Sequence, residues 1–146
     1  MSYGYVYVAH VNMGASQNQV LKAFKEAEAY DGPSIIIAYS PCIAHGYNMA
    51  QSPLHQKTAT DIGYWPIYRY NPALADEGKN PLVMDSKKLK DDSYREYLLS
   101  ETRYKTLCDS KPEHAKKLFE VNEKQATDKF KYLMELSKIS YMDDKE

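Results

Sequence analysis

Cys42 and His45 are the residues whose types and spacing most invite chemistry. They lie in the segment Ser-Pro-Cys-Ile-Ala-His-Gly, residues 40–46. A thiolate and an imidazole can ligate a soft metal, and an imidazole can activate a thiol as a nucleophile. A separation of three residues in a loop does not ensure contact between two side chains, however, and free cysteine behaves most often as a small buried hydrophobe. Among the interpretations of Cys42, the residue types and their spacing therefore favour packing most and a nucleophile pair with His45 least.

A complete metal centre is not predicted within this chain. Zinc and iron–sulfur sites need about four ligands, and no C-x-x-C pair is present. Among the hypotheses for the function of the whole chain, a mononuclear metal or small ligand bound at Cys42 and His45 is the weakest. The standard glycine patterns that cradle phosphates are absent too, so nucleotide binding is not predicted. The cysteines and histidines available are Cys42, Cys108, His10, His45, His55 and His114.

The elements around residues 40–46 suggest why that loop could carry a ligand. Residues 34–39 form a continuous apolar run, typical of a strand buried on both faces, and residues 3–11 are rich in aromatic and β-branched types. Between them Ser16 can cap a helix. Strand, helix and strand predict a parallel pair with a right-handed crossover, whose ligands bind at the carboxyl ends of the strands. The loop at 40–46 is a better candidate than the loop at 12–16.

Downstream, the pattern predicts a helix near residues 52–62 and a strand over 65–70, which Pro66 should direct to a sheet edge. A short strand is expected at 82–84. Ser110 and Pro112 indicate the start of a long amphipathic helix, whose apolar stripe needs a partner surface in this domain or in a neighbour. The predicted stripe consists of Leu118, Val121, Ala126, Phe130, Leu133 and Leu136.

Other conspicuous residues have plain interpretations. Arg69 alternates with two tyrosines on a predicted strand, which favours a surface or interface ion pair. The lysine-rich run at 87–90 is typical of a solvated segment, with docking of an acidic redox partner as a lesser possibility. The fourteen tyrosines are expected to pack rather than to stack on bases. Residues 143–146 should fray.

The composition narrows the function classes. The chain has 146 residues, 19 basic and 20 acidic side chains and a net charge of -1, which favours neither nucleic acid nor an anionic membrane as partner. No apolar run approaches the roughly 20 residues of a membrane span. Two distant cysteines and no visible export signal indicate a reducing cytoplasm. A start directly in a strand suggests a truncated domain.

Several segments together resemble the C-terminal part of pyruvate:ferredoxin (or flavodoxin) oxidoreductases. They are Tyr-Gly-Tyr-Val-Tyr-Val-Ala-His-Val-Asn-Met-Gly-Ala at 3–15, the long segment 22–46 that ends in Pro-Cys-Ile-Ala-His-Gly, Gly-Tyr-Trp-Pro-Ile-Tyr-Arg-Tyr-Asn-Pro at 63–72, and Glu-Gly-Lys-Asn-Pro at 77–81. The resemblance covers nearly the whole chain and is most specific over residues 3–72.

The resemblance implies a large thiamine-diphosphate and Mg²⁺ enzyme. Such an enzyme decarboxylates pyruvate, passes electrons along three [4Fe-4S] clusters to ferredoxin or flavodoxin, transfers the acetyl group to coenzyme A, and is a homodimer. Cys42 is similar in position to the last of the four ligands of the cluster nearest the thiamine. The family's other three ligands come from sequence upstream of this chain.

The resemblance also implies the fold class. The expectation is α/β, a partial thiamine-diphosphate-binding domain that is Rossmann-like with a mostly parallel sheet. Residues 1–75 would be its C-terminal βαβ part, and residues 76–146 a charged, mainly helical C-terminal extension.

Departures from the family matter equally. The family's Gly-Asp-Gly segment and downstream asparagine, which hold Mg²⁺ and diphosphate, are absent, as are the C-x-x-C cluster motifs. Neither cofactor should therefore bind this chain alone stably, and activity in isolation is not expected. The alternative is a stand-alone, non-catalytic protein-interaction module derived from the same fold.

Overall fold

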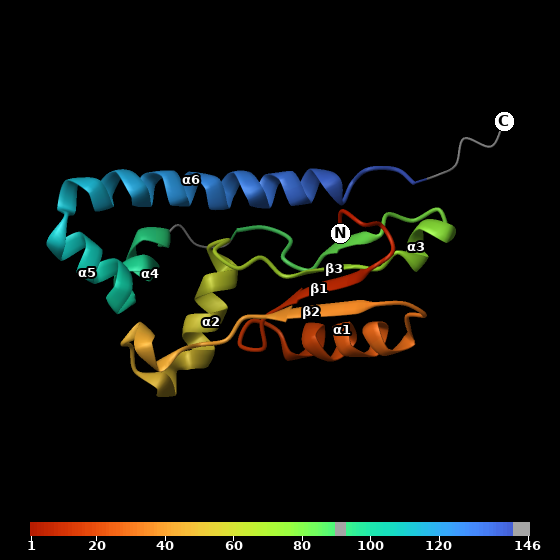
Figure 1. Ribbon diagram of the computed structural model, residues 1–146, viewed down its shortest axis with the longest axis horizontal. Coiled ribbons are helices and arrows are strands. Elements are labelled where there is room, and N and C mark those ends of the chain that lie inside the picture. Colours follow the sequence, from red (N-terminus) through yellow and green to blue (C-terminus); the bar gives the residue numbers. More distant parts are fainter. Residues whose placement is uncertain (90–92, 142–146) are drawn as a thin grey trace.

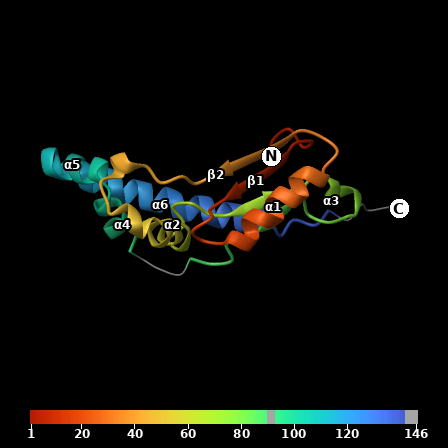
Figure 2. The same cartoon turned by 90° about the horizontal axis from the view of Figure 1, so that it is seen from below.

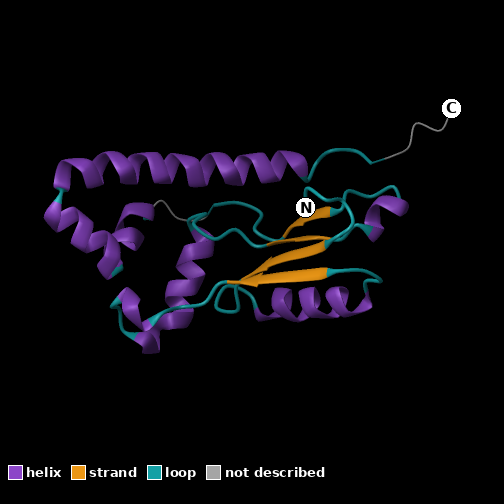
Figure 3. Ribbon diagram, in the orientation of Figure 1, coloured by secondary structure: helices purple, strands orange, loops and turns teal. Residues whose placement is uncertain are grey.

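The computed structural model describes residues 1–89 and 93–141, which form an α/β structure around a four-stranded sheet (Figures 1 and 3). The predicted run at 87–90 lies partly outside these residues and the predicted frayed end at 143–146 wholly outside them. The sheet order is β2-β1-β3-β4. The strands are β1 (Tyr7–Val11), β2 (Ser34–Ala38), β3 (Tyr68–Tyr70) and β4 (Leu82–Met84).

The α/β class with a helical C-terminal part is confirmed, but the expectation of a mostly parallel sheet is wrong. Only β1 and β2 pair in parallel, whereas β3 is antiparallel to both β1 and β4. The reason is the place of α2 (Ser52–Asp61), which lies beyond the carboxyl ends of β1 and β2 instead of crossing a sheet face (Figure 1). The chain therefore re-enters the sheet from that end and runs in the opposite direction.

The predicted strand–helix–strand unit is confirmed. Ser16 caps α1 (Gln17–Ala29) by accepting a 3.2 Å hydrogen bond from the amide of Gln19. Val20 and Ala23 of this helix pack against the fully buried strand β1. The strand itself starts at Tyr7, because the chain turns at Met1 to Gly4 before it enters the sheet.

The expected burial of β2 on both faces is wrong. Ile35 is 52% exposed and Ile37 43% exposed, while Ile36 packs against the cluster under α1. A strand at the edge of the sheet has a neighbour on one side only, and α1 covers only one of its faces. The apolar side chains of the other face are left accessible in this chain.

The strand after Pro66 is not at an edge, contrary to the prediction. β3 lies between β1 and β4. Pro66 precedes the first residue of the strand, so its missing N–H does not interrupt the ladder. The short strand predicted at 82–84 is confirmed as β4.

Helices make up most of the second half. Two single 3₁₀ turns, η1 (Ile43–His45) and η2 (Met49–Gln51), precede α2. Helix α6 runs along much of the long axis of the molecule, from α4 and α5 to the strands (Figures 1 and 2). Ser110 is not the cap of α6, because it is the last residue of α5 and its hydroxyl donates back to Thr106. The remaining helices are α3 (Ala73–Asp76), α4 (Tyr94–Ser100), α5 (Thr102–Ser110) and α6 (Pro112–Leu136).

The long amphipathic helix is confirmed, and four of the six predicted stripe residues are buried or pack against the core, namely Ala126, Phe130, Leu133 and Leu136. Leu118 and Val121, two predicted members of the stripe, are 43% and 52% exposed. At one end α6 joins a core cluster with α2, α4 and α5, and at the other Leu133 packs with Tyr68 and Leu82 of the sheet. The partner surface of α6 is thus this same chain. The buried positions of the helix are Ala115, Phe119, Phe130 and Leu133.

The two predicted units share these clusters, since β4 completes the sheet and α2 packs with α4 and α6. The division at residue 75 stays a prediction. Among the described helices, none combines the length and the apolar character that a membrane crossing requires.

The buried side chain of His10 in β1 should make the stability of the fold depend on pH. Its ring stacks between Trp65 and Tyr68 at centroid distances of 3.9 and 5.1 Å, and its Nδ1 lies 2.6 Å from the carbonyl oxygen of Pro66. Burial lowers the pKa of His10 below 6.5, only partly offset by the bond to Pro66, and the charge of Lys129 acts in the same direction as burial. The neutral ring is therefore the form that the fold favours.

In the unfolded chain His10 is protonated as the pH falls through about 6.5, whereas in the folded chain its lower pKa delays protonation. The stabilisation from the neutral ring is therefore complete above pH 6.5 and is lost as the pH falls toward the lower pKa of the folded state. We expect the urea midpoint of wild type to fall between pH 7 and pH 5. His10→Gln should flatten this dependence, whereas exposed His114→Ala should leave it unchanged. An equally steep fall in His10→Gln would show that other groups cause it.

Candidate functional site

Cys42 lies on the loop that leaves the carboxyl end of β2, as the sequence predicted. It precedes η1, and its thiol is free and exposed. The packing interpretation of Cys42 is therefore wrong. Among the interactions described, the thiol has no hydrogen bond to His45, so the structure brings no support to the nucleophile pair. Cys108 is also free and half-buried against the cluster around α4.

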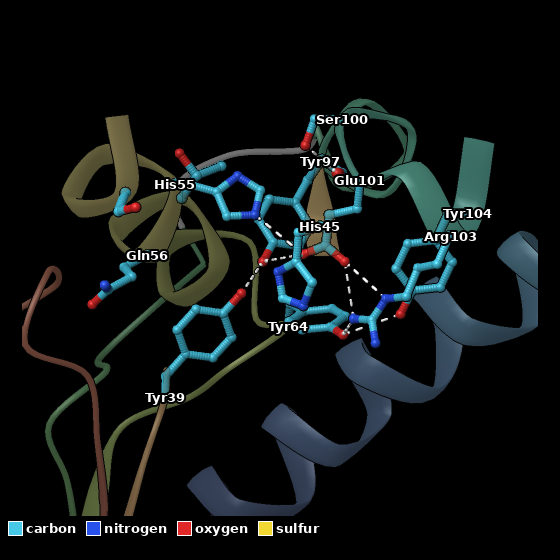
Figure 4. A network of polar contacts seen from close by, with 12 residues as sticks. Tyr39, His45, His55, Gln56, Tyr64, Tyr97, Ser100, Glu101, Arg103 and Tyr104 are labelled. Atoms are coloured by element: carbon cyan, nitrogen blue, oxygen red, sulfur yellow. Dashed lines mark hydrogen bonds and ion pairs between the residues drawn. The ribbon is translucent and has the colours of Figure 1, made fainter. Parts of the chain in front are cut away.

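His45 instead joins a buried cluster centred on Glu101 (Figure 4). Glu101 connects α4 to α5 and is 0% exposed. Its Oε1 lies 3.1 Å from Nε2 of His55 on α2 and 3.4 Å from Nδ1 of His45. Arg103 holds the other oxygen, with both Nε and Nη2 at 2.9 Å from Oε2. We call His45, His55, Glu101 and Arg103 the Glu101 cluster.

Tyrosine rings enclose the Glu101 cluster. Tyr47 and Tyr97 stack against the ring of His55 at centroid distances of 4.0 and 4.5 Å. The hydroxyl of Tyr97 lies 2.7 Å from that of Tyr39 at the end of β2. Burial, together with the contact to Tyr39, raises the pKa of Tyr97, so the hydroxyl stays protonated. The carboxylate of Glu101 is therefore buried among hydrogen-bond donors, although the arginine of the cluster has a side chain that is 51% exposed.

Gly46 allows η1 to approach the start of α5. Its φ is +77°, a backbone conformation that glycine adopts readily. A Cβ at this position would lie 1.8 Å from the hydroxyl oxygen of Thr102, the residue after Glu101. The Ala-His-Gly sequence thus places the imidazole of His45 against the carboxylate.

Sequence reasoning missed His55 and Glu101 as parts of a site. They are 46 residues apart in the chain, and no spacing rule joins them. Glu101 also lies in a segment with no pattern that marks a buried carboxylate. Only the tertiary packing of α2 against the α4–α5 junction reveals the set.

Arg69 forms ion pairs, as predicted, but they are buried instead of superficial. It makes a two-point contact with Asp85, with Nε at 2.9 Å and Nη2 at 3.0 Å, and a close bond to Glu26 of α1. Burial alone would lower the pKa of Arg69, but the hydrogen bonds to Asp85 and Glu26 outweigh it and raise the pKa. Arg69 and Asp85 line a cavity of about 760 Å³ at the amino end of α1.

No protein-family model matches this chain, but individual proteins do. It is 54% identical over 138 residues to a pyruvate:ferredoxin oxidoreductase of Moorella thermoacetica, which covers 92% of this chain and 12% of that protein. It is 54% identical over 120 residues to a pyruvate-flavodoxin oxidoreductase of Nostoc sp., covering 82% and 10%. A mitochondrial pyruvate dehydrogenase [NADP(+)] of Euglena gracilis is 50% identical over 117 residues, covering 79% and 6%. The chain thus spans about one tenth of the length of most of these curated relatives.

Proposed function

This chain is homologous to a segment of the pyruvate:ferredoxin and pyruvate-flavodoxin oxidoreductases, and on this premise we propose that it serves as one portion of such an enzyme. Its role there would be to complete the thiamine-diphosphate domain and to supply the Cys42 thiolate to a [4Fe-4S] cluster. The remaining ligands, thiamine diphosphate and Mg²⁺ would be held by other parts of the enzyme, which would act as a homodimer.

The observation that carries this proposal is the free, exposed thiol of Cys42 at the carboxyl end of β2. Iron–sulfur clusters are held by cysteine thiolates, usually four of them. One accessible thiolate fits one ligand of a shared cluster, and the chain has only one other cysteine. Bound there, the cluster would carry electrons away from the oxidised substrate, and Cys42 would anchor it to the loop that follows β2.

The open face of β2 fits the same proposal. Ile35 and Ile37 are exposed on an edge strand, a position that soluble domains usually protect. In an assembled enzyme, further protein would cover this face and pair with this edge. The chain on its own would then lack both the neighbours of β2 and the rest of the cofactor ligands, and we propose that it has no activity in isolation.

Pyruvate is the substrate that we propose, since the names of the relatives share it. Their names differ in the electron acceptor, which is ferredoxin, flavodoxin or NADP(+). Relatives so similar in this segment differ in acceptor, so we expect acceptor choice to be decided elsewhere in the enzyme. Two free cysteines suit a reducing compartment such as the cytoplasm.

The test is cluster content in the enzyme that contains this chain. We expect Cys42→Ser to lower the iron content by roughly four atoms per subunit, the content of one [4Fe-4S] cluster, and to abolish pyruvate oxidation. Cys108→Ser is the matched control and should retain full iron and activity. The separate 146-residue chain, treated anaerobically with iron and sulfide, should hold no stable cluster. Unchanged iron in Cys42→Ser would refute the ligand assignment, and a stable cluster in the separate chain would refute its dependence on a partner.

A further inference from the structure

We propose that His45, His55 and Glu101 form a binding site for a divalent transition metal ion, with Zn²⁺ as the best-suited ion and no ligand from Cys42. The three side chains come from η1, α2 and the α4–α5 junction. The ligand atoms that they offer all lie within 4.8 Å of one another.

The separations suit a tetrahedral ion. Zinc bonds of about 2.0–2.2 Å place neighbouring ligand atoms roughly 3.3 Å apart. Oε1 of Glu101 lies 3.1 Å from Nε2 of His55 and 3.4 Å from Nδ1 of His45. A small adjustment between the two imidazoles would complete a three-ligand set, with a water molecule in the fourth position.

A buried nitrogen of His45 that makes no hydrogen bond supports the presence of a ligand. This nitrogen, Nδ1, has no such partner although it lies 3.4 Å from the carboxylate oxygen. The distance is that of a charge contact, but the ring is not aimed to donate to Glu101. Buried ring nitrogens normally have a partner. A metal ion between His45 and Glu101 would satisfy this nitrogen through its lone pair.

The surrounding contacts resemble those that hold metal ligands in place. Arg103 fixes Oε2 of Glu101, which leaves Oε1 to face the histidines. Because Arg103 also offsets the charge of the carboxylate, binding would depend chiefly on the two neutral imidazoles. Such a set favours zinc and similar ions over Mg²⁺ or Ca²⁺, which need several oxygen ligands.

An ion can reach these residues from the surface. A cavity of about 260 Å³ is lined by Tyr47, His55 and Tyr97, among others. The side chain of His45 is 16% exposed and that of His55 is 9% exposed, whereas Glu101 is fully covered. A bound ion would join three segments far apart in the sequence and would so fix the loop that carries Cys42.

The competing explanation is a metal-free cluster in which the histidines simply contact the carboxylate. Titration of the metal-free 146-residue chain with Co²⁺, followed by displacement with Zn²⁺, separates the two. The visible absorption of Co²⁺ reports the number and type of ligands, and the chain must carry no histidine tag. We expect one equivalent to bind with a nitrogen and oxygen spectrum that lacks thiolate charge-transfer bands.

Variants make the assignment specific. We expect His45→Ala and His55→Ala each to weaken binding by roughly 100-fold or more. His114→Ala and Cys42→Ser should bind as wild type, because His114 is exposed and neither residue belongs to the group of side chains that gathers at Glu101. Zn²⁺ should also raise the thermal unfolding midpoint of wild type and not of His55→Ala. Circular dichroism identifies any variant that fails to fold, and His55→Gln then takes the place of His55→Ala.

Three outcomes would overturn the proposal. They are the absence of stoichiometric metal binding by the folded wild-type chain, binding of Co²⁺ with the affinity of wild type in both histidine variants, and loss of binding in Cys42→Ser. Each of these results contradicts the ligand set His45, His55 and Glu101. None of them bears on whether Cys42 holds an iron–sulfur cluster, because the proposal for that cluster is tested by the iron content of the whole enzyme.

Discussion

Replacement of Arg69 with alanine is expected to lower the free energy of unfolding by about 3–5 kcal/mol, the range for removing one partner of a buried ion pair. The side chain of Arg69 is 6% exposed, and those of Glu26 and Asp85 are 24% and 19% exposed. Without the guanidinium, Asp85 would lose its two-point contact with a cation, and Glu26 would keep as its cationic partner the exposed Lys22, whose Nζ lies 4.0 Å from its Oε1. Urea denaturation of wild type and variant at pH 7 measures the loss.

Two further variants separate charge from packing. Arg69→Met combined with Glu26→Gln and Asp85→Asn removes all three charges and should recover much of the stability, because neutral groups cost less to bury. Lys79→Ala breaks a pair with Glu77 in which the side chains are 66% and 55% exposed, and should cost less than about 1 kcal/mol. A small loss in Arg69→Ala, similar to that in Lys79→Ala, would show that water screens the Arg69 pairs.

The elements that the sequence predicted well are those set by local signals. The cap at Ser16, the apolar run of β2 and the short strand β4 each depend on residues within a few positions of one another. The long helix α6 was found for the same reason. Its start was missed by one residue, because Ser110 ends α5 and Lys111 takes the N-cap position of α6.

Burial and strand direction could not be predicted in the same way. The run Ile35, Ile36 and Ile37 is equally apolar throughout, yet its exposure depends on β2 being at the edge of the sheet. Pro66 argued for an edge strand but stands just outside β3. Both errors arise because the order of strands in a sheet is a property of the tertiary fold. Here α2 lies beyond the carboxyl ends of β1 and β2, so the chain enters β3 from that end (Figure 1).

The candidate site likewise contains one part that local sequence signals predicted and one part that they did not. The loop bearing Cys42 was predicted because ligands gather at the carboxyl ends of strands, and its cysteine is accessible there. The Glu101 cluster was not predicted, because it depends on long-range packing of α2, η1 and the α4–α5 junction. A buried glutamate is recognisable only once the structure shows its partners.

Leu98 carries the second large effect that we expect, because it lies at the centre of the packing behind the Glu101 cluster. It is 0% exposed on α4, three residues before Glu101. Its cluster includes Ala59 of α2, Ile62 directly after that helix, and Phe119 of α6. Leu98→Ala would remove methyl groups from a site with little room to collapse, so we expect a loss of about 3–4 kcal/mol in the free energy of unfolding.

Leu118→Ala is the matched control, since the same atoms are removed from a side chain that is 43% exposed. It should cost less than about 1 kcal/mol. Because Leu98 packs where α2 meets α4, its loss should also weaken Co²⁺ binding, whereas Leu118→Ala should leave binding unchanged. Equal urea midpoints for the two variants would mean that the cluster around Leu98 adds little to the stability of the fold, and that the histidines of η1 and α2 are held to Glu101 by their own polar contacts alone.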